Sequence, residues 1–202
     1  MSKRERIIDI ATTLFSSYGF CKTSLSDIAT NAKLGIGTIY YHFVSKEELF
    51  LAVLDRLNRS LLSKIEKVYN SDLDYVSKIT QVYLAILLNF DEDNLRLVSL
   101  IDNFPRGVIR DSNGFTTNLI DKSNEYVLKL IKEGQVRKEI RVDIDAEQMI
   151  CLINHIARYD DKQKEYKNLV QHFKFVKENK ELLVKLIFDS LRVDNKLKLV
   201  SE

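Results

Sequence analysis

Apolar residues recur three or four positions apart along most of the chain, which is the spacing of one face of an α-helix. The first stripe consists of Ile7, Ala11, Leu14, Phe15 and Tyr18, and the second of Leu25, Ile28, Ala29 and Ala32. The first stripe stops at Gly19, a residue type that often follows the last turn of a helix. The second starts behind Ser24, and Asp27 stands three residues later, so this pair can form a capping box. We therefore predict two helices within residues 1–32.

A longer stripe begins at Ser45, which can form a second capping box with Glu48, and it continues to about residue 69. Pro105 and Gly134 are expected to end two of the helices that follow. The later stretches with a helical period are residues 76–90, 97–104, 115–131, 146–157 and 166–191.

The C-terminal half departs from a simple helical pattern in two places. Residues 136–145 lack the period and are predicted to be extended. Polar residues 177–181 interrupt the last stretch, which could be one long helix or two, and two helices are favoured. One proline and six glycines are too few for the turns of an all-β protein, so the chain is predicted to be all-α. Cys151 lies in an apolar stretch of its predicted helix and is expected to be a small core residue.

Aromatic and polar rings are concentrated in the segment GIGTIYYHF, residues 35–43. Residues 33–35 join it to the preceding helix, which is the spacing of a helix-turn-helix unit, whose second helix enters the major groove of DNA. Gly35 and Gly37 have no side chain that would hold this helix away from the bases, and the hydroxyls that follow can bond bases or phosphates. Residues 1–46 hold six lysine and arginine residues against three acids, although the whole chain has a net charge of only +2. This local surplus weakly favours a polyanion as partner.

The stretch FSSYGFCKTSLSDIATNAKLGIGTIYYHFVSKEELF, residues 15–50, resembles the DNA-binding segment of TetR/AcrR-type transcriptional repressors. Its shared elements, in order, are Tyr18-Gly19-Phe20, Thr23, Asp27-Ile28-Ala29, Gly37-Thr38, Tyr40, Phe43 and Ser45-Lys46-Glu47-Glu48-Leu49. The resemblance covers about residues 4–60, and the rest of the chain matches only in helical pattern and length. It implies an all-α fold in which an N-terminal three-helix helix-turn-helix domain precedes a helical regulatory and dimerisation domain.

The resemblance also implies what the protein binds. It implies a homodimer that represses transcription from a palindromic operator in double-stranded DNA and is released by a small-molecule effector, which the sequence does not identify. The domains are then residues 1–47 and 48–202, connected by a helix over about residues 45–69, whose movement would separate the two recognition helices from successive grooves. The residues expected to contact DNA are Thr23, Ser24, Ile36, Gly37, Thr38, Tyr40, Tyr41, His42 and Lys46.

Several of these contacts have competing interpretations. Phe43 is expected to face the core, and Tyr40 and Tyr41 cannot both do so, which leaves DNA contact or core packing for each. His42 could contact a phosphate or be a polar neighbour of the first helix. Lys46 could reach a phosphate or simply be solvated.

Three positions depart from the usual pattern of the family. Lys33 stands in the turn where glycine is frequent, and a lysine with a positive φ would cost about 1 kcal/mol. Gly35 replaces the usual serine cap and is a weaker cap. Ile36 stands where a polar, base-reading side chain is frequent, and it could touch a thymine methyl group.

A two-fold dimer is expected because one helix-turn-helix unit reads few bases. The residues predicted for the dimer interface belong to the last helices and are Ile150, Ile153, Leu183, Leu186 and Ile187.

Other classes of function find less support in the sequence. No catalytic arrangement is evident, so the chain is predicted not to be an enzyme, and no cofactor is predicted. The acidic runs at residues 91–93 and 143–145 are interpreted as caps and turns rather than metal sites. No apolar run approaches the roughly 18 residues of a membrane span, so no membrane partner and a cytoplasmic location are expected. An activator, a ligand-independent regulator and a helical protein-interaction module remain as alternatives.

Overall fold

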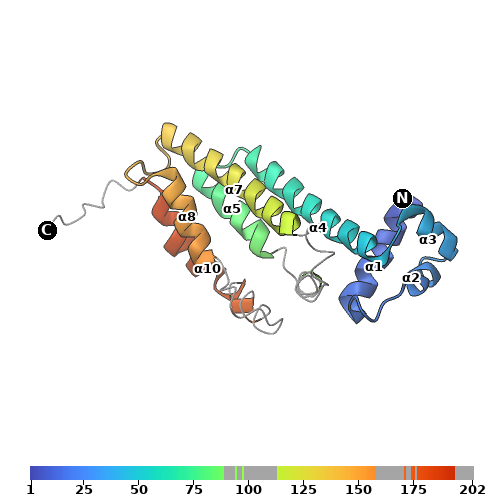
Figure 1. Ribbon diagram of the computed structural model, residues 1–202. Helices are drawn as coiled ribbons and strands as arrows, with labels where there is room; N and C mark the ends of the chain where they lie inside the picture. Colours follow the sequence, from blue (N-terminus) through green and yellow to red (C-terminus); the bar gives the residue numbers. More distant parts are fainter. Residues whose placement is uncertain are drawn as a thin grey trace. The chain divides into compact units, whose positions relative to one another are not determined.

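The structure is a computed structural model that describes residues 1–88, 94, 97, 113–157, 171, 174–175 and 177–193. The described part is helical, as predicted, and short connections join α1 to α5 in succession (Figure 1). Within these ranges no strand is formed, and a single antiparallel bridge joins Ile140 to Arg192. The helices are α1 Lys3–Tyr18, α2 Leu25–Asn31, α3 Ile36–His42, α4 Lys46–Tyr69, α5 Tyr75–Leu88, α7 Asn113–Val136, α8 Ala146–Ala157 and α10 Lys180–Leu183, followed by a π-helical turn Val184–Phe188 and a 3-10 turn Asp189–Leu191.

The chain divides into two compact units, which we call unit 1 and unit 2. Unit 1 contains Met1–Ser60, and unit 2 contains α5, α8 and the parts of α4 and α7 that follow Ser60 and Asn118. The predicted domain boundary between residues 47 and 48 stays a prediction. None of the helices in the described ranges is long and apolar enough to cross a membrane.

Unit 1 is held together by an aromatic core. The ring centroids of Phe15 and Phe20 each lie 5.4 Å from that of Phe50, so α1, the loop after it and α4 meet at one point. Such aromatic pairs contribute about 0.5–1.5 kcal/mol beyond the area that they bury. At the edge of this core, Arg56 of α4 pairs with Asp9 of α1.

The predicted helix starts are confirmed. In α2 the Ser24 hydroxyl accepts the N–H of Asp27 at 3.1 Å, and the Asp27 carboxylate accepts the N–H of Ser24 at 2.9 Å. At α4 only half of the predicted box forms, since the Ser45 hydroxyl accepts the N–H of Glu48 at 3.1 Å. The Glu48 carboxylate reaches one residue further back and accepts the N–H of Val44 at 2.6 Å.

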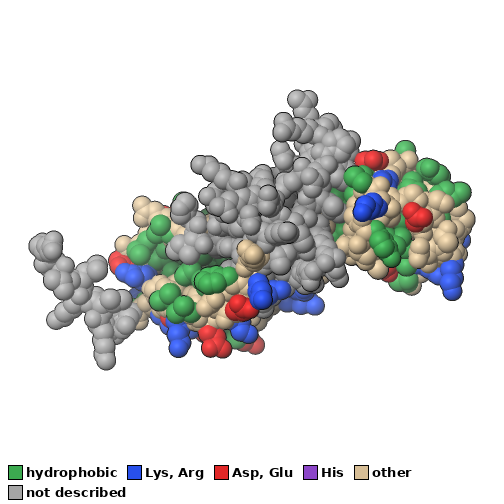
Figure 2. All heavy atoms as spheres, turned by 90° about the horizontal axis from the view of Figure 1, so that it is seen from below, with side chains coloured by type: hydrophobic (Ala, Val, Ile, Leu, Met, Phe, Trp, Pro, Cys, Tyr) green, Lys and Arg blue, Asp and Glu red, His purple; other side chains and the backbone are tan. Residues whose placement is uncertain are grey.

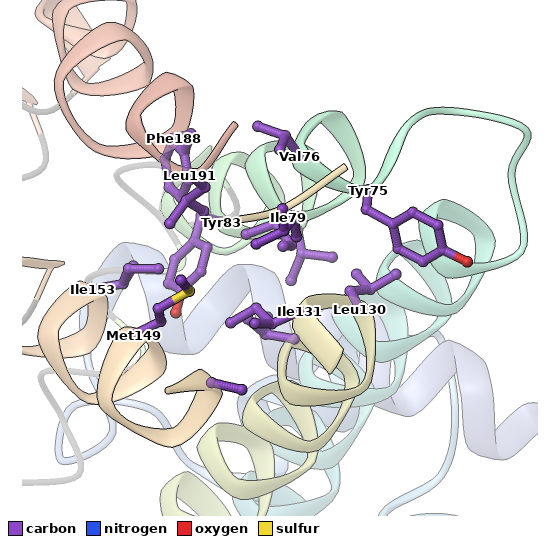
Figure 3. Packing of buried hydrophobic residues seen from close by; sticks show 14 of the residues in the cluster. Tyr75, Val76, Ile79, Tyr83, Leu130, Ile131, Met149, Ile153, Phe188 and Leu191 are labelled. Carbon is purple, nitrogen blue, oxygen red and sulfur yellow. The ribbon is translucent and has the colours of Figure 1, made fainter. Parts of the chain in front are cut away.

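Unit 2 is a helical bundle with one continuous apolar core. Figure 3 shows side chains of α5, α7, α8 and the C-terminal turns pointing toward one another. The fully or almost fully buried members include Val76, Ile79, Leu130, Ile131, Met149, Ile153 and Phe188. A chain of hydrogen bonds crosses this core, from the Tyr83 hydroxyl to the Asn154 oxygen at 3.0 Å and from the Asn154 amide to the Asn124 oxygen at 2.9 Å. The three helices α5, α8 and α7 are therefore linked by polar as well as apolar contacts.

The end of α7 differs from the prediction. Gly134 does not follow the helix but lies inside it, and the left-handed residue is Lys138, with a φ of 61°. A Cβ atom on Gly134 would come within 2.7 Å of Ile140 Cδ1 and 2.9 Å of Tyr75 Cβ, so this glycine permits close packing rather than a turn. The residues after Val136 form turns and bends, and among them only Ile140 is paired, so the predicted extended segment 136–145 is mostly wrong.

Two further predictions concern α8 and the C-terminal helices. Cys151 is exposed, which contradicts its expected place in the core, because the neighbouring Met149 and Ile153 occupy the inner face of α8. The predicted interruption at residues 177–181 corresponds to a turn at Asn179, directly before α10. The predicted helix 97–104, its end at Pro105 and most of the stretch 166–176 lie outside the described residues, apart from single helical positions such as Leu97.

Candidate nucleic-acid interface

The turn between α2 and α3 has a regular geometry despite its lysine. Lys33 has a φ of 52°, in the left-handed region where glycine is usual. The N–H of Leu34 donates to the Ala29 carbonyl at 2.9 Å, and the N–H of Lys33 donates to the Thr30 carbonyl at 3.0 Å. These two bonds define a Schellman motif, which ends α2 and turns the chain toward α3. The positive φ considered for Lys33 is therefore confirmed, and the turn forms although this conformation is unfavourable for a lysine.

One face of α3 is anchored in the core of unit 1. Ile39 and Phe43 are buried, and the N–H of Phe43 donates to the Ile39 carbonyl at 2.9 Å, which closes the last turn of the helix. Gly35 caps the start with a φ of −68° and ψ of 144°, without a side-chain hydrogen bond. The core role predicted for Phe43 is confirmed.

The opposite face of α3 is open. Ile36, Tyr40 and Tyr41 are 43%, 57% and 84% exposed, so neither tyrosine packs in the core. A Cβ atom on Gly37 would meet nothing within 4 Å, so the backbone there is accessible. Positions 36 and 40, and likewise 37 and 41, are four apart and therefore lie on the same side of the helix. The structure thus brings together four of the residues predicted to contact DNA.

The other two residues of α3 are partly covered. Thr38 and His42 are half-buried, and the N–H of Thr38 donates to the Gly35 carbonyl at 2.8 Å. The His42 ring packs against the edge of the Tyr41 ring, with centroids 5.0 Å apart. His42 therefore lies beside the open face, where it can support Tyr41.

Thr23 and Ser24 are used inside the protein. Thr23 is 3% exposed, its hydroxyl donates to the Gly19 carbonyl at 2.9 Å, and its N–H donates to the Phe20 carbonyl at 3.3 Å. Both donors of Thr23 are therefore used within the loop between α1 and α2, and its contact with DNA stays a prediction. Ser24 is exposed, but its hydroxyl donates to Asp27 at 2.6 Å, and this bond holds the pKa of Asp27 below its usual value.

Lys46 also has an internal role. Its ammonium nitrogen donates to the Phe20 carbonyl at 2.9 Å and to the Thr23 carbonyl at 3.0 Å, and it lies 4.2 Å from the centroid of the Phe20 ring. A lysine has three donors, so at most one remains for a phosphate. Lys46 therefore connects the loop between α1 and α2 to the start of α4 rather than being a merely solvated charge, and its contact with a phosphate stays a prediction.

Arg4 is a further cation beside α3, and no sequence pattern predicts a role for it. Its guanidinium carbon lies 5.0 Å from the centroid of the Phe43 ring, at the C-terminal end of α3. Figure 1 shows the N-terminus of the chain next to α3. Arg4 and Phe43 lie far apart in the sequence and no motif links them, so only the folded chain reveals this pair.

Charged side chains of both signs lie on the side of unit 1 that Figure 2 shows. In this view, lysine, arginine and acidic side chains are scattered among hydrophobic ones. The features that suit α3 for DNA are therefore its shape and its hydrogen-bonding rings more than a strong field.

This chain resembles known proteins in both sequence and fold. A family model described as "Bacterial regulatory proteins, tetR family" matches residues 7–53. The HTH-type transcriptional regulator SAB2452 of Staphylococcus aureus (strain bovine RF122 / ET3-1) is 31% identical over 158 residues, which are 74% of this chain and 83% of that protein. The HTH-type transcriptional repressor KstR2 of Mycolicibacterium smegmatis is 23% identical over 146 residues, which are 72% of this chain and 71% of that protein.

A solved structure agrees in fold. The transcriptional regulator of the TetR/AcrR family from Thermobifida fusca YX-ER1 superposes with a TM-score of 0.67 at 22% identity and covers 91% of this chain and 97% of that one. The matched proteins are transcriptional regulators and not enzymes, as predicted. The family model matches residues 7–53, and SAB2452 is 31% identical over 74% of this chain. This chain therefore belongs to the tetR family of bacterial regulatory proteins.

Proposed function

We propose that the protein is a dimeric transcriptional repressor that binds a palindromic operator through α3 and is released from it by a small-molecule effector. The observation that carries the DNA-binding step is the two-sided character of α3, which is anchored by Ile39 and Phe43 and presents Ile36, Tyr40 and Tyr41 outward. A helix held in this way by a preceding short helix can enter a major groove with its exposed side chains toward the bases. Repression, rather than activation, is supported by the repressor KstR2 among the relatives.

Selection of duplexes from a random pool by the purified protein, followed by gel shift, tests this proposal. The expected result is a two-fold symmetric DNA site that the protein binds much more tightly than it binds random DNA. Thr38→Ala and Tyr40→Phe should each weaken binding to that site roughly 5- to 50-fold, the loss of one or two hydrogen bonds, while the fold and the assembly stay intact. Unchanged affinity in both variants would show that α3 does not bind DNA by these groups. If the protein binds no duplex even at low salt, the result would instead favour a protein-interaction module.

Dimerisation is supported by exposed apolar side chains on unit 2. Leu152, Phe175, Leu182 and Leu186 are 58%, 62%, 53% and 68% exposed, and Figure 2 shows hydrophobic side chains on the visible side of this unit. Such exposure of large apolar residues is typical of an interaction surface. Of the residues predicted for the interface, Leu186 is exposed, whereas the other four are less accessible. Ile153 is only 4% exposed because it packs in the core of its own unit, and Ile150, Leu183 and Ile187 are half-buried.

Release by an effector rests on the composition of unit 2. The hydrogen-bonded chain of Tyr83, Asn154 and Asn124 places polar groups inside an otherwise apolar bundle, where a ligand between helices could exchange bonds with them. An effector that favours one arrangement of α4 would lower DNA affinity by allosteric coupling. In this proposal residues 1–47 bind DNA, residues 48–202 bind the effector and the second protomer, and α4 connects them. Screening small molecules for loss of the gel shift tests this step, and a regulator that no molecule releases would be ligand-independent.

A further inference from the structure

We infer that Arg4 binds a phosphate of the DNA backbone beside the C-terminal end of α3. This inference rests on the proposed DNA-binding function. It adds a residue that the family resemblance did not supply.

The position of Arg4 is set by an immobile partner. Its guanidinium carbon lies 5.0 Å from the centroid of Phe43, whose ring is buried and whose N–H is bonded to Ile39. A guanidinium stacked in this way on an aromatic face keeps a defined place, because the ring cannot move without opening the core. Since Phe43 is also the C-terminal cap of α3, the charge of Arg4 keeps a constant position relative to that helix.

The donors of Arg4 remain free for a ligand. Stacking uses the face of the guanidinium and leaves its in-plane N–H groups at the edges. Arg4 is exposed, and within the described part of the chain it has no hydrogen bond or ion pair. The adjacent Glu5 carboxylate is used by the capping box of α1, where it accepts the N–H of Ser2 at 2.7 Å.

Two other cations of unit 1, Arg56 and Lys46, have partners within the protein. Arg56 bonds Asp9 and donates to the Thr12 hydroxyl at 2.9 Å, and Lys46 bonds two carbonyl oxygens. A cation in the first turn of a helix is unfavourable for the helix dipole, so Arg4 does not stabilise α1 by its charge. A planar fork of free N–H groups fits the oxygens of a phosphate, and phosphates line both sides of a groove that holds a recognition helix.

The test uses the full-length protein and the operator that it selects. Arg4→Gln removes the charge, Arg4→Lys keeps the charge without the fork, and Lys3→Gln is the matched control for a charge lost one residue away. Arg4→Gln should weaken binding to operator and to random duplexes alike, by roughly 10- to 100-fold, and should make the slope of log affinity against log salt shallower by about one per protomer. Arg4→Lys should keep the slope of the wild type and lose affinity several-fold. Lys3→Gln should change both quantities much less.

A scan with neutral methylphosphonate linkages, placed one at a time in the operator, identifies the phosphate. One position in each half-site should weaken the wild type and leave Arg4→Gln unaffected, since the contact is already lost there. The inference is overturned if no position behaves so, if Arg4→Gln matches Lys3→Gln, or if Arg4→Gln mainly lowers the preference for operator over random DNA. Wild-type protein that selects no operator would contradict the proposed function itself, which is a separate outcome.

Discussion

The two left-handed lysines show how single residues store strain in this fold. Lys33 and Lys138 have φ values of 52° and 61°, and each follows a helix whose last carbonyls are bonded in a Schellman motif. The left-handed conformation is unfavourable by roughly 1–2 kcal/mol for a residue with a Cβ atom. Glycine adopts it without this steric penalty and is disfavoured only by its greater loss of chain entropy on folding.

We therefore predict that Lys33→Gly and Lys138→Gly each stabilise the protein by about 0.5–1 kcal/mol, measured by denaturant unfolding. Lys33→Ala is the control, because alanine keeps the Cβ atom and should give no such gain. Equal stability of the glycine and alanine variants would show that the turn is not strained.

Lys46 gives a second prediction at the residue scale. Lys46→Met keeps the aliphatic stem but loses two hydrogen bonds from a charged donor, so unit 1 should lose about 2 kcal/mol of stability. Thermal or denaturant unfolding followed on unit 1 measures this loss, and Lys22→Met, at an exposed lysine of the same loop, is the control. Weaker DNA binding by Lys46→Met with unchanged stability would restore the phosphate contact as its main role.

Helices, capping boxes and turns were predicted from the sequence where their determinants are local. Ser24 and Asp27 are three residues apart, and their mutual bonds follow from that spacing. The roles of Thr23 and Lys46 were not predictable in this way, because their partners come from other elements. Lys46 bonds carbonyls that lie 26 and 23 residues before it, and no motif encodes a lysine that points inward. The same limit explains Gly134, whose neighbours Ile140 and Tyr75 become visible only after folding.

Gly134 and Gly37 form a contrasting pair at the scale of the helix. Both lie inside helices, where alanine is intrinsically favoured over glycine by roughly 1 kcal/mol. Gly134→Ala should nevertheless destabilise unit 2 by about 1–3 kcal/mol, since its methyl group would clash with Ile140 and Tyr75.

Gly37→Ala should leave stability unchanged or raise it, because the added methyl group meets open space. It should weaken operator binding, since the methyl group would stand between α3 and the bases. Unfolding curves and gel shifts on both variants check this contrast, and a stable Gly134→Ala protein would contradict the packing at the end of α7.

At the scale of the whole molecule, the proposed dimer depends on the exposed apolar side chains of unit 2. Leu186→Glu and Leu152→Glu place a charge among them without touching the core, so each should convert the proposed dimer to a monomer and abolish tight operator binding. Sedimentation or light scattering measures the change. Val136→Glu, at an 83% exposed position of α7, is the control and should remain dimeric. Dimers that survive both leucine substitutions would place the interface elsewhere.

The all-α class and the place of the DNA-binding segment were predictable, since they depend on periodicity and on one dense motif. Which apolar residues are exposed was predicted less well, because helical spacing alone does not tell which apolar stripe of a helix packs in the core of its own unit. Ile153 and Leu152 are adjacent in α8, yet the first is buried and the second is open.

The buried phenol of Tyr83 makes unit 2 sensitive to alkali. Burial raises the pKa of Tyr83, whose hydroxyl donates to Asn154. In the unfolded chain the phenol ionises near its ordinary value of about 10, so above that pH unfolding releases a proton. Hydroxide should therefore act as a denaturant of this bundle, with stability falling as the pH rises past about 10, and Tyr83→Phe should reduce that fall. The difference in tyrosinate absorbance between the wild type and Tyr83→Phe, followed during an alkaline titration, would then report the opening of unit 2 around Tyr83.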